Sequence, residues 1–275
     1  MFTRFAPSPT GHLHLGHVYA AKFASDLAAK NAGRFLLRFE DIDTTRVREE
    51  YYREIEHDLH WLGIEWSGTP MRQLDRMQAY SDALEQLKAM DAVYPCFCTR
   101  REIQSEIESM THAPHGPEGA LYPGTCRALP QSETEDRLGA GDLHCWRLNA
   151  STAAELTDSL VFRDETQGSI VVDPFLLGDV VLARKDIATS YHLAVVVDDA
   201  YQEITDVTRG EDLLASTHVH RILQELLNLP EPQYHHHRLI LDAQGKRLAK
   251  RDDSLSISTL REQGKSPDEV LAMLA

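Results

Sequence analysis

The sequence predicts an α/β fold on a parallel sheet, interrupted by a cysteine-bearing insertion. Three observations predict it. Apolar strand-like segments at residues 2–5 and 34–39 flank a segment of helical periodicity at residues 14–31, which is the order of a βαβ unit. Residues 95–170 contain all four cysteines and a loop rich in Gly, Pro and His. Strongly apolar runs resume after about residue 175.

The elements before the insertion follow from apolar spacing and from turn residues. The segment Phe-Thr-Arg-Phe is typical of a buried strand, and the Pro-Ser-Pro-Thr-Gly turn ends it. The tripeptide Asn31-Ala-Gly33 ends the first helix, because Asn and Gly favour helix C-termini. Further amphipathic helices are expected at about residues 45–62 and 72–90.

We divide the chain into residues 1–94, the insertion at 95–170, and residues 171–275. In the last segment a helix is expected at residues 212–227, followed by a strand, a turn and a loop, with a short helix at the end of the chain. The triple histidine at residues 235–237 is interpreted as a strand-adjacent packing and surface feature near the nucleotide, and not as a tag.

The composition is that of an ordinary globular protein of one large domain or two modest ones. The 275 residues are 42% hydrophobic and 26% charged, with no apolar run of about 18 residues and no basic-then-apolar signal region. Four cysteines are too few for a disulfide framework. We therefore expect a cytoplasmic protein without membrane association. The net charge of −15 argues against broad nucleic-acid affinity but allows a local basic face.

The motif His14-Leu-Gly-His17 stands where the first strand gives way to the first helix. Backbone N–H groups at a helix N-terminus favour anions, and Gly16 allows a flat ligand to approach the backbone closely. Two imidazoles on one turn can donate hydrogen bonds to phosphate oxygens. The alternative is that both histidines only cap the helix or lie on the surface, and this motif alone does not decide between the two.

Four spaced motifs together resemble the glutamyl-tRNA synthetase family of class I aminoacyl-tRNA synthetases. They are RFAPSPTGHLHLGH near the N-terminus, LRFEDIDTTR at 37–46, YHLAVVVDDAYQEITDVTRGEDLL at 191–214, and RLILDAQGKRLAKRD after residue 237. The first contains a HIGH-like element with Leu in place of Ile, and the last a KMSKS-like loop. The resemblance implies a class I, Rossmann-like parallel sheet with a zinc-bearing, mixed α/β insertion.

The resemblance also implies ATP chemistry. A carboxylate attacks the α-phosphorus of ATP and pyrophosphate leaves, with Mg²⁺ bridging the phosphates. The implied catalytic residues are His14, His17 and Lys250, and the implied ATP contacts are His14, Gly16, His17, Arg247 and Lys250. The lysine loop departs from the family pattern, because Arg247 replaces its first Lys and because Ala249 and Arg251 replace its two Ser. A solvated basic loop is the alternative interpretation.

A glutamate pocket requires a cation for the side-chain carboxylate and an acceptor for the α-ammonium. By resemblance the pocket is formed by Arg4, Phe5, Ala6, Pro7, Ser8, Glu40, Tyr191 and Arg209. Arg4 and Arg209 are the cationic candidates, Glu40 would accept from the ammonium, and the Tyr191 hydroxyl would donate. Each of these residues also has an ordinary structural alternative, such as a surface ion pair for Arg209.

The cysteines predict a structural zinc site. The segment Tyr122-Pro-Gly-Thr-Cys126 begins about two dozen residues after Cys96 and Cys98, and three thiolates hold Zn²⁺ when a fourth ligand completes the tetrahedron. Cys145 is the generic fourth ligand, with His112 and His115 as further candidates. The family pattern instead implies Tyr122, four residues before Cys126, and we expect the set Cys96, Cys98, Tyr122 and Cys126.

The printed chain ends about twenty-five residues after the lysine loop, whereas full glutamyl-tRNA synthetases continue into a helical half that binds the anticodon. We therefore expect no anticodon-binding domain. By resemblance this implies a truncated branch of the family that activates glutamate without tRNA and esterifies it onto queuosine at the wobble position of tRNA(Asp). The expected partners of a monomeric enzyme are ATP, L-glutamate and queuosine-containing tRNA(Asp). A free-standing ligase that charges a tRNA 3′ end and a non-catalytic RNA-binding paralogue remain as alternatives.

Overall fold

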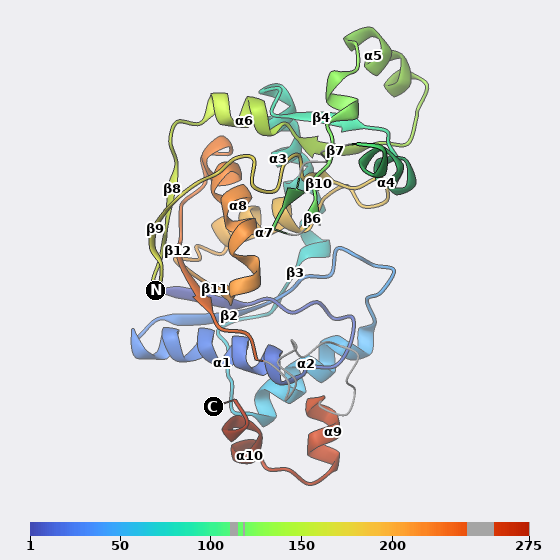
Figure 1. The fold of residues 1–275 in the computed structure, drawn as a ribbon. Helices are drawn as coiled ribbons and strands as arrows, with labels where there is room; N and C mark the ends of the chain where they lie inside the picture. The colour runs from blue at the N-terminus through green and yellow to red at the C-terminus, as the bar shows by residue number, and fades with distance from the viewer. Residues whose placement is uncertain (111–114, 118, 241–255, 275) are drawn as a thin grey trace.

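The structure is a computed structural model that describes residues 1–110, 115–117, 119–240 and 256–274 (Figure 1). Its first half is built on β1 (Phe2–Phe5), β2 (Arg34–Phe39) and β3 (Met71–Arg72), with α1 (Leu15–Lys30) between the first two strands. The strands pair in parallel in the order β1-β2-β3. The predicted βαβ unit is therefore confirmed.

The second half continues the parallel arrangement. Strand β11 (Asp206–Gly210) pairs in parallel with β12 (Gln233–His237), which pairs in parallel with β8 (Val161–Asp164). Strand β9 (Gly168–Val171) closes this sheet as an antiparallel edge. Residue Thr205 donates its backbone N–H to the Phe2 carbonyl, which brings β11 alongside β1. The carboxyl ends of β1, β2 and β11 therefore open onto a common region of the fold.

Further helices pack around these sheets and around α1. They are α2 (Glu49–Trp61), α3 (Met77–Ala89), α7 (Tyr191–Tyr201), α8 (Leu214–Leu226), α9 (Ile257–Glu262) and α10 (Pro267–Ala272). Short 3₁₀ turns at Gln73–Arg76 and Glu211–Leu213 precede α3 and α8. No helix in the described ranges is both long and apolar enough to cross a membrane.

Three helix predictions differ from the structure at their ends. Helix α2 starts at Glu49, later than expected, because residues 41–48 form a turn in which the Thr45 hydroxyl donates to Asp43. The helix expected from residue 72 begins with a 3₁₀ turn. The last segment contains two helices, since Gly264, at φ +82°, ends the first and the Ser266 capping box starts the second.

The middle of the chain forms a smaller, mixed α/β part at the upper end of the molecule in Figure 1. Its antiparallel sheet has the order β10-β7-β4. Its elements are β4 (Val93–Cys96), α4 (Arg100–Ser109), β5 (His115–Gly116), β6 (Gly119–Ala120), α5 (Gln131–Gly139), β7 (Cys145–Leu148), α6 (Ala150–Leu156) and β10 (Val181–Ala183). Strands β8 and β9 pair with β12 of the main sheet, whereas β10, which follows them in the chain, pairs with β7 of the middle part. The strand order therefore gives no single point at which the middle part ends, and the insertion boundaries at residues 94 and 170 stay a prediction.

The C-terminal helices pack against the first half of the fold, near α1 and α2 in Figure 1. The side chains of Ile257, Leu260 and Val270 are buried in the same hydrophobic cluster as the inner faces of α1 and α2. The backbone of Ile257 donates to the Leu13 carbonyl, and Ser256 forms an isolated β-bridge with His14. The chain that follows the lysine loop is thus tied to the turn that carries the first histidine motif.

Candidate functional site

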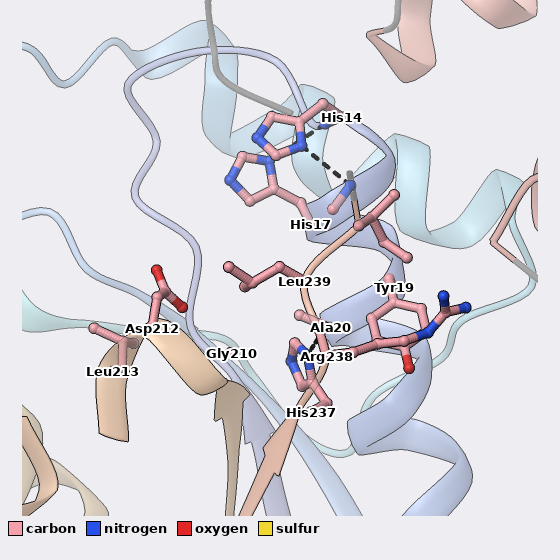
Figure 2. Close-up of a pocket in the computed structure, with 12 residues that line it drawn as sticks. His14, His17, Tyr19, Ala20, Gly210, Asp212, Leu213, His237, Arg238 and Leu239 are labelled. Atoms are coloured by element: carbon pink, nitrogen blue, oxygen red, sulfur yellow. Dashed lines mark hydrogen bonds between the residues drawn. The ribbon is translucent and has the colours of Figure 1, made fainter. Parts of the chain in front are cut away.

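The two histidines of the opening motif form a stacked pair at the start of α1 (Figure 2). Their ring centroids are 3.7 Å apart. His14 is the N-cap, and its Nδ1 accepts from the Gly16 N–H at 3.1 Å, while the His14 N–H donates to His17 Nδ1 at 3.3 Å. Because both Nδ1 atoms accept, this pattern assigns the imidazole hydrogens to Nε2. The two histidines therefore do cap the helix, as the alternative interpretation expects. The cap contacts also fix the orientation of both rings and of their Nε2–H groups.

Gly16 leaves room for the His14 ring. A Cβ at Gly16 would lie 3.1 Å from His14 Cε1 and 3.2 Å from its Nδ1. Its backbone lines a hollow that also includes His237 and Gly210, as the close-up in Figure 2 shows. The predicted ATP contacts His14, Gly16 and His17 thus lie together. Arg247 and Lys250 fall outside the described residues.

The residues predicted for the glutamate pocket all line one cavity of about 400 Å³. They are Arg4, Phe5, Ala6, Pro7, Ser8, Glu40, Tyr191 and Arg209. His17 lines the same cavity, so it adjoins the hollow of Figure 2. Strands β1 and β2 deliver the first six of these residues at or just beyond their carboxyl ends, and β11 and the start of α7 supply the other two.

Arg4 is held by a buried carboxylate. Its Nε and Nη2 donate to the two Asp199 oxygens at 2.9 and 3.1 Å, and its Nη1 donates to the Thr208 carbonyl. Asp199 also pairs with Arg38, whose Nη2 lies 2.8 Å from Asp199 Oδ1. Both arginines hold the pKa of Asp199 below its ordinary value, although burial alone would raise it. Arg4 therefore shapes the cavity with its charge already paired.

Glu40 follows β2 and is 17% exposed. Burial raises the pKa of its carboxyl to about 7, against the opposing influence of the Arg38 and Arg4 charges. Burial also raises the pKa of the Tyr191 hydroxyl, so that it is a neutral donor. A carboxylate and a phenol are thus placed on the same cavity wall.

Arg209 enters the cavity from β11 and is 5% exposed. Its Nε donates to His236 Nε2 at 3.2 Å, its Nη1 lies 2.8 Å from His220 Nδ1, and its Nη2 donates to the Thr217 hydroxyl. The surface ion pair considered as its alternative does not occur with Glu211 or Asp212, since no carboxylate pairs with Arg209 within the described ranges.

A second cavity of about 390 Å³ adjoins the first and shares Ser8, Glu40 and Tyr191 with it. Charged residues surround its outer part: Asp43, Arg46 and Arg184. Arg184 also forms a bidentate pair with Asp186. The two cavities together offer space for two ligands that meet at Glu40 and Tyr191.

Three thiols of the middle part could hold a metal ion. The sulfurs of Cys96, Cys98 and Cys126 all lie within 4.8 Å of one another. A tetrahedral zinc with Zn–S bonds of about 2.3 Å places sulfurs about 3.8 Å apart, which this spacing fits. The Tyr122 hydroxyl lies 3.4 Å from Cys96 Sγ and 3.6 Å from Cys98 Sγ.

Cys145 lies beside this group of three thiols. It faces Cys96 across the β4–β7 pairing, and its thiol lowers the pKa of the Cys96 thiol. Cys145 is not part of the group of sulfurs that lie within 4.8 Å of one another, whereas the Tyr122 hydroxyl lies close to two of them. Tyr122 as the fourth ligand stays a prediction. His112 and the side chain of His115 lie outside the described residues.

The triple histidine is buried, so its predicted surface role is wrong. Each of the three is at most 8% exposed. His235 contacts Asp206 at 2.8 Å, His236 contacts Asp164 at 2.7 Å, and His237 lines the hollow beside His14. The packing role is confirmed, because all three side chains are buried and two of them contact aspartates of neighbouring strands.

Comparison with known proteins identifies the family. The profile described as tRNA synthetases class I (E and Q), catalytic domain, matches residues 1–275. The chain belongs to this family. Membership in these class I tRNA synthetases makes the protein a ligase and accounts for its parallel sheet.

Similar members of the family differ in length. A protein of Rhodobacter capsulatus named "Glutamyl-Q tRNA(Asp) synthetase" is 47% identical over 100% of this chain and 99% of its own length. One of the same name from Nocardia farcinica is 43% identical over 98% of this chain and 82% of its own. The crystal structure of a glutamate tRNA ligase from Elizabethkingia meningosepticum, in complex with its amino acid, aligns with a TM-score of 0.75 at 31% identity. That alignment covers 92% of this chain and 52% of the crystallised ligase.

Proposed function

We propose that the protein activates L-glutamate with ATP and transfers it to queuosine at the wobble position of tRNA(Asp). One observation carries the proposal: the eight residues predicted for a glutamate pocket line a single cavity that also includes His17. The names of two relatives that match 98–100% of this chain at 43–47% identity support the choice of acceptor. A cytoplasmic, monomeric protein remains our expectation.

Activation joins glutamate to AMP. A carboxylate oxygen of glutamate attacks the α-phosphorus of ATP, the bond to the β-phosphate breaks, and pyrophosphate leaves. The Nε2–H donors of His14 and His17 stabilise the charge that develops on the phosphate oxygens, with Lys250 and Arg247 proposed as further contacts. Mg²⁺ bound with ATP would neutralise phosphate charge.

The amino acid is held by three groups. Arg209 receives the side-chain carboxylate, since its charge is not already paired as that of Arg4 is. Glu40 accepts from the α-ammonium, and the Tyr191 hydroxyl donates to the ligand. Placing both reactants in adjoining hollows converts the reaction into an effectively intramolecular step.

The second cavity supports the transfer step. A hydroxyl of the queuosine cyclopentenediol attacks the activated carbonyl, an ester forms, and AMP leaves with the proton passing to its phosphate. This cavity meets the glutamate cavity at Ser8, Glu40 and Tyr191, so an acceptor there reaches the adenylate. Arg46 and Arg184 on its rim suit the phosphates of an RNA loop.

Activity assays test the proposal. Glutamate-dependent ATP–pyrophosphate exchange without tRNA is expected, followed by transfer of labelled glutamate to queuosine-containing tRNA(Asp) and none to tRNA lacking queuosine. Exchange with label on the terminal adenosine would favour the free-standing ligase that charges a 3′ end. Absence of both reactions would favour the non-catalytic RNA-binding alternative.

We propose that Cys96, Cys98, Tyr122 and Cys126 hold a structural zinc ion, which would pin a part of the chain with a small apolar core. Replacing Cys98 with serine is expected to remove bound zinc and to lower the thermal unfolding midpoint, as measured by elemental analysis and calorimetry. Cys145→Ser is the matched control and should keep its zinc. Unchanged zinc in Cys98→Ser, or zinc loss in Cys145→Ser, would contradict this ligand set.

The affinity for glutamate should depend on pH through Glu40. Because the pKa of this carboxyl is raised to about 7, it loses the charge that binds the ammonium as the pH falls through that value. We expect the KM for glutamate to rise about tenfold from about pH 8 to about pH 6. Glu40→Gln should have a higher KM that is flat over this range. The same slope in both proteins would show that another group is responsible.

A further inference from the structure

Arg209 is held differently from the other buried arginines. Among the residues that the structure describes, three arginines are buried: Arg4, Arg38 and Arg209. The first two share the Asp199 carboxylate. Arg209 has no ion pair in the described ranges. Burying a guanidinium without a carboxylate partner lowers the stability of the folded protein. The surroundings of Arg209 therefore need a separate explanation.

Neutral acceptors surround the Arg209 guanidinium. His236 contacts Asp164 through Nδ1 at 2.7 Å, so its hydrogen lies on Nδ1 and its Nε2 accepts from Arg209. His220 Nδ1 faces Arg209 Nη1 at 2.8 Å, so its hydrogen lies on Nε2, which points to His192 Nδ1 at 3.1 Å. The Thr217 hydroxyl accepts from Nη2 and donates to the Leu213 carbonyl.

Burial keeps these histidines neutral. It lowers the pKa of His236 to about 4 and that of His220 well below its ordinary value, and the Arg209 charge lowers both further. Asp164 lies behind His236, where it also accepts from the backbone of Thr166, Gln167 and His236. The nearest negative charge along this chain of contacts is thus separated from Arg209 by a whole imidazole ring.

The charges at the cavity consequently do not balance. When Glu40 is ionised, the three buried guanidiniums of Arg4, Arg38 and Arg209 outnumber the two carboxylates of Asp199 and Glu40 by one charge. The surplus positive charge matches the net charge of L-glutamate, which is −1. Glutamine has the same shape and no net charge, so it would leave the surplus unpaired and offer the guanidinium one acceptor oxygen where glutamate offers two.

We propose that His220, His236 and Thr217 form a neutral socket for Arg209, and that the neutrality of this socket makes the cavity select glutamate over glutamine. The three are positioning residues that act through Arg209. Three of its five N–H groups are used by the socket, so donors remain for the ligand. This inference rests on the proposed function and names what sets its substrate preference.

A matched pair of variants tests the socket. Thr217→Asp and Thr217→Asn have the same shape, but only the first places a negative charge beside Arg209. Relative to Thr217→Asn, we expect Thr217→Asp to raise the KM for glutamate about tenfold or more with kcat within about threefold. Its preference for glutamate over glutamine, as a ratio of kcat/KM in pyrophosphate exchange, should fall about tenfold or more.

Equal preference in the two variants would overturn the proposal. Should Thr217→Asp fail to fold, the pair His220→Glu and His220→Gln gives the same comparison, and calorimetric binding of glutamate and glutamine replaces the rate where exchange is slow. A wild-type protein without glutamate-dependent exchange would instead refute the proposed function. Exchange by the wild type with an unchanged preference in the charged variants would refute the socket alone.

Discussion

Replacing His17 with alanine is expected to lower the rate of glutamate-dependent pyrophosphate exchange about 100-fold to 1,000-fold at saturating substrates. The variant loses an N–H donor at the junction of the two hollows, where His17 stacks on His14. A donor aimed at developing phosphate charge acts mainly in the transition state, so kcat should fall more than the KM for glutamate rises. Steady-state exchange kinetics measure both constants.

His17 is a better choice than His14 for this measurement. His14 is the N-cap, and its Nδ1 accepts from the Gly16 N–H in the first turn of α1, so its removal also changes the helix start. His17 accepts from the N–H of His14, which precedes the helix. His60→Ala on the surface of α2 is the matched control and should retain wild-type exchange, because its ring contacts Glu65 and Trp66 and lines neither of the two cavities. A folded His17→Ala protein with exchange within about threefold of the wild type would remove His17 from the catalytic residues.

The alternation of strand, helix and strand could be predicted because it depends on local spacing. Residues 2–39 contain one apolar face per element and clear end signals, so β1, α1 and β2 were predicted within one or two residues. The start of α2 was not predicted correctly, because a loop with polar turn contacts precedes its first helical residue. Helix periodicity extends through such loops, and only the hydrogen bonds of the folded chain locate the end.

The histidines of β12 show a second reason why sequence-based prediction fails. An exposed edge strand alternates between a buried and a solvent face, and three consecutive histidines suit such a strand poorly. The structure pairs β12 with β11 on one edge and β8 on the other, and all three histidines are buried, so both faces of the strand are covered and the side chains need internal partners. Which strand lies at the centre of a sheet depends on contacts far apart in sequence, which the local pattern of residues 233–237 does not contain.

The family resemblance predicted the residues that line the candidate site. It did not predict the residues that hold those side chains in place. Asp199 meets Arg4 across 195 positions of the chain, and no periodicity links the two. The only local signal was a pair of aspartates, Asp198 and Asp199, in an otherwise apolar helix. Both are buried, and acidic residues in such places are paired as a rule. That signal could have predicted a buried ion pair, but it could not have identified its partners.

Replacing Asp199 with asparagine is expected to destabilise the protein by about 3–5 kcal/mol. The neutral side chain would leave two buried guanidiniums, those of Arg4 and Arg38, without their carboxylate. Urea unfolding at neutral pH, followed by circular dichroism, measures the change. Asp26→Asn removes an exposed ion pair with Lys22 and should change stability by at most about 0.5 kcal/mol.

The effect of Asp199 should also depend on pH in a definite direction. Its two arginines hold the pKa of this carboxyl below its ordinary value of 3.8 in the folded protein. A lowered pKa adds stability above the ordinary value, and that stability is lost as the pH falls through the folded pKa. The difference between Asp199→Asn and the wild type should thus be constant from neutral pH to about pH 5 and shrink below about pH 4. A difference below about 1 kcal/mol at neutral pH would mean that the arginines find other partners or water.

The same variant tests how the glutamate cavity is held open. Asp199 lies on α7 and fixes Arg4 of β1 and Arg38 of β2, which comes two residues before Glu40. Loss of this carboxylate frees two positive charges within reach of Glu40, which lies 3.8 Å from Arg38. A freed Arg38 would compete with the substrate ammonium for Glu40. We therefore expect the KM for glutamate to rise in Asp199→Asn under conditions in which the variant is fully folded, because the ion pair that stabilises the junction of the two halves also keeps Glu40 available to the ligand.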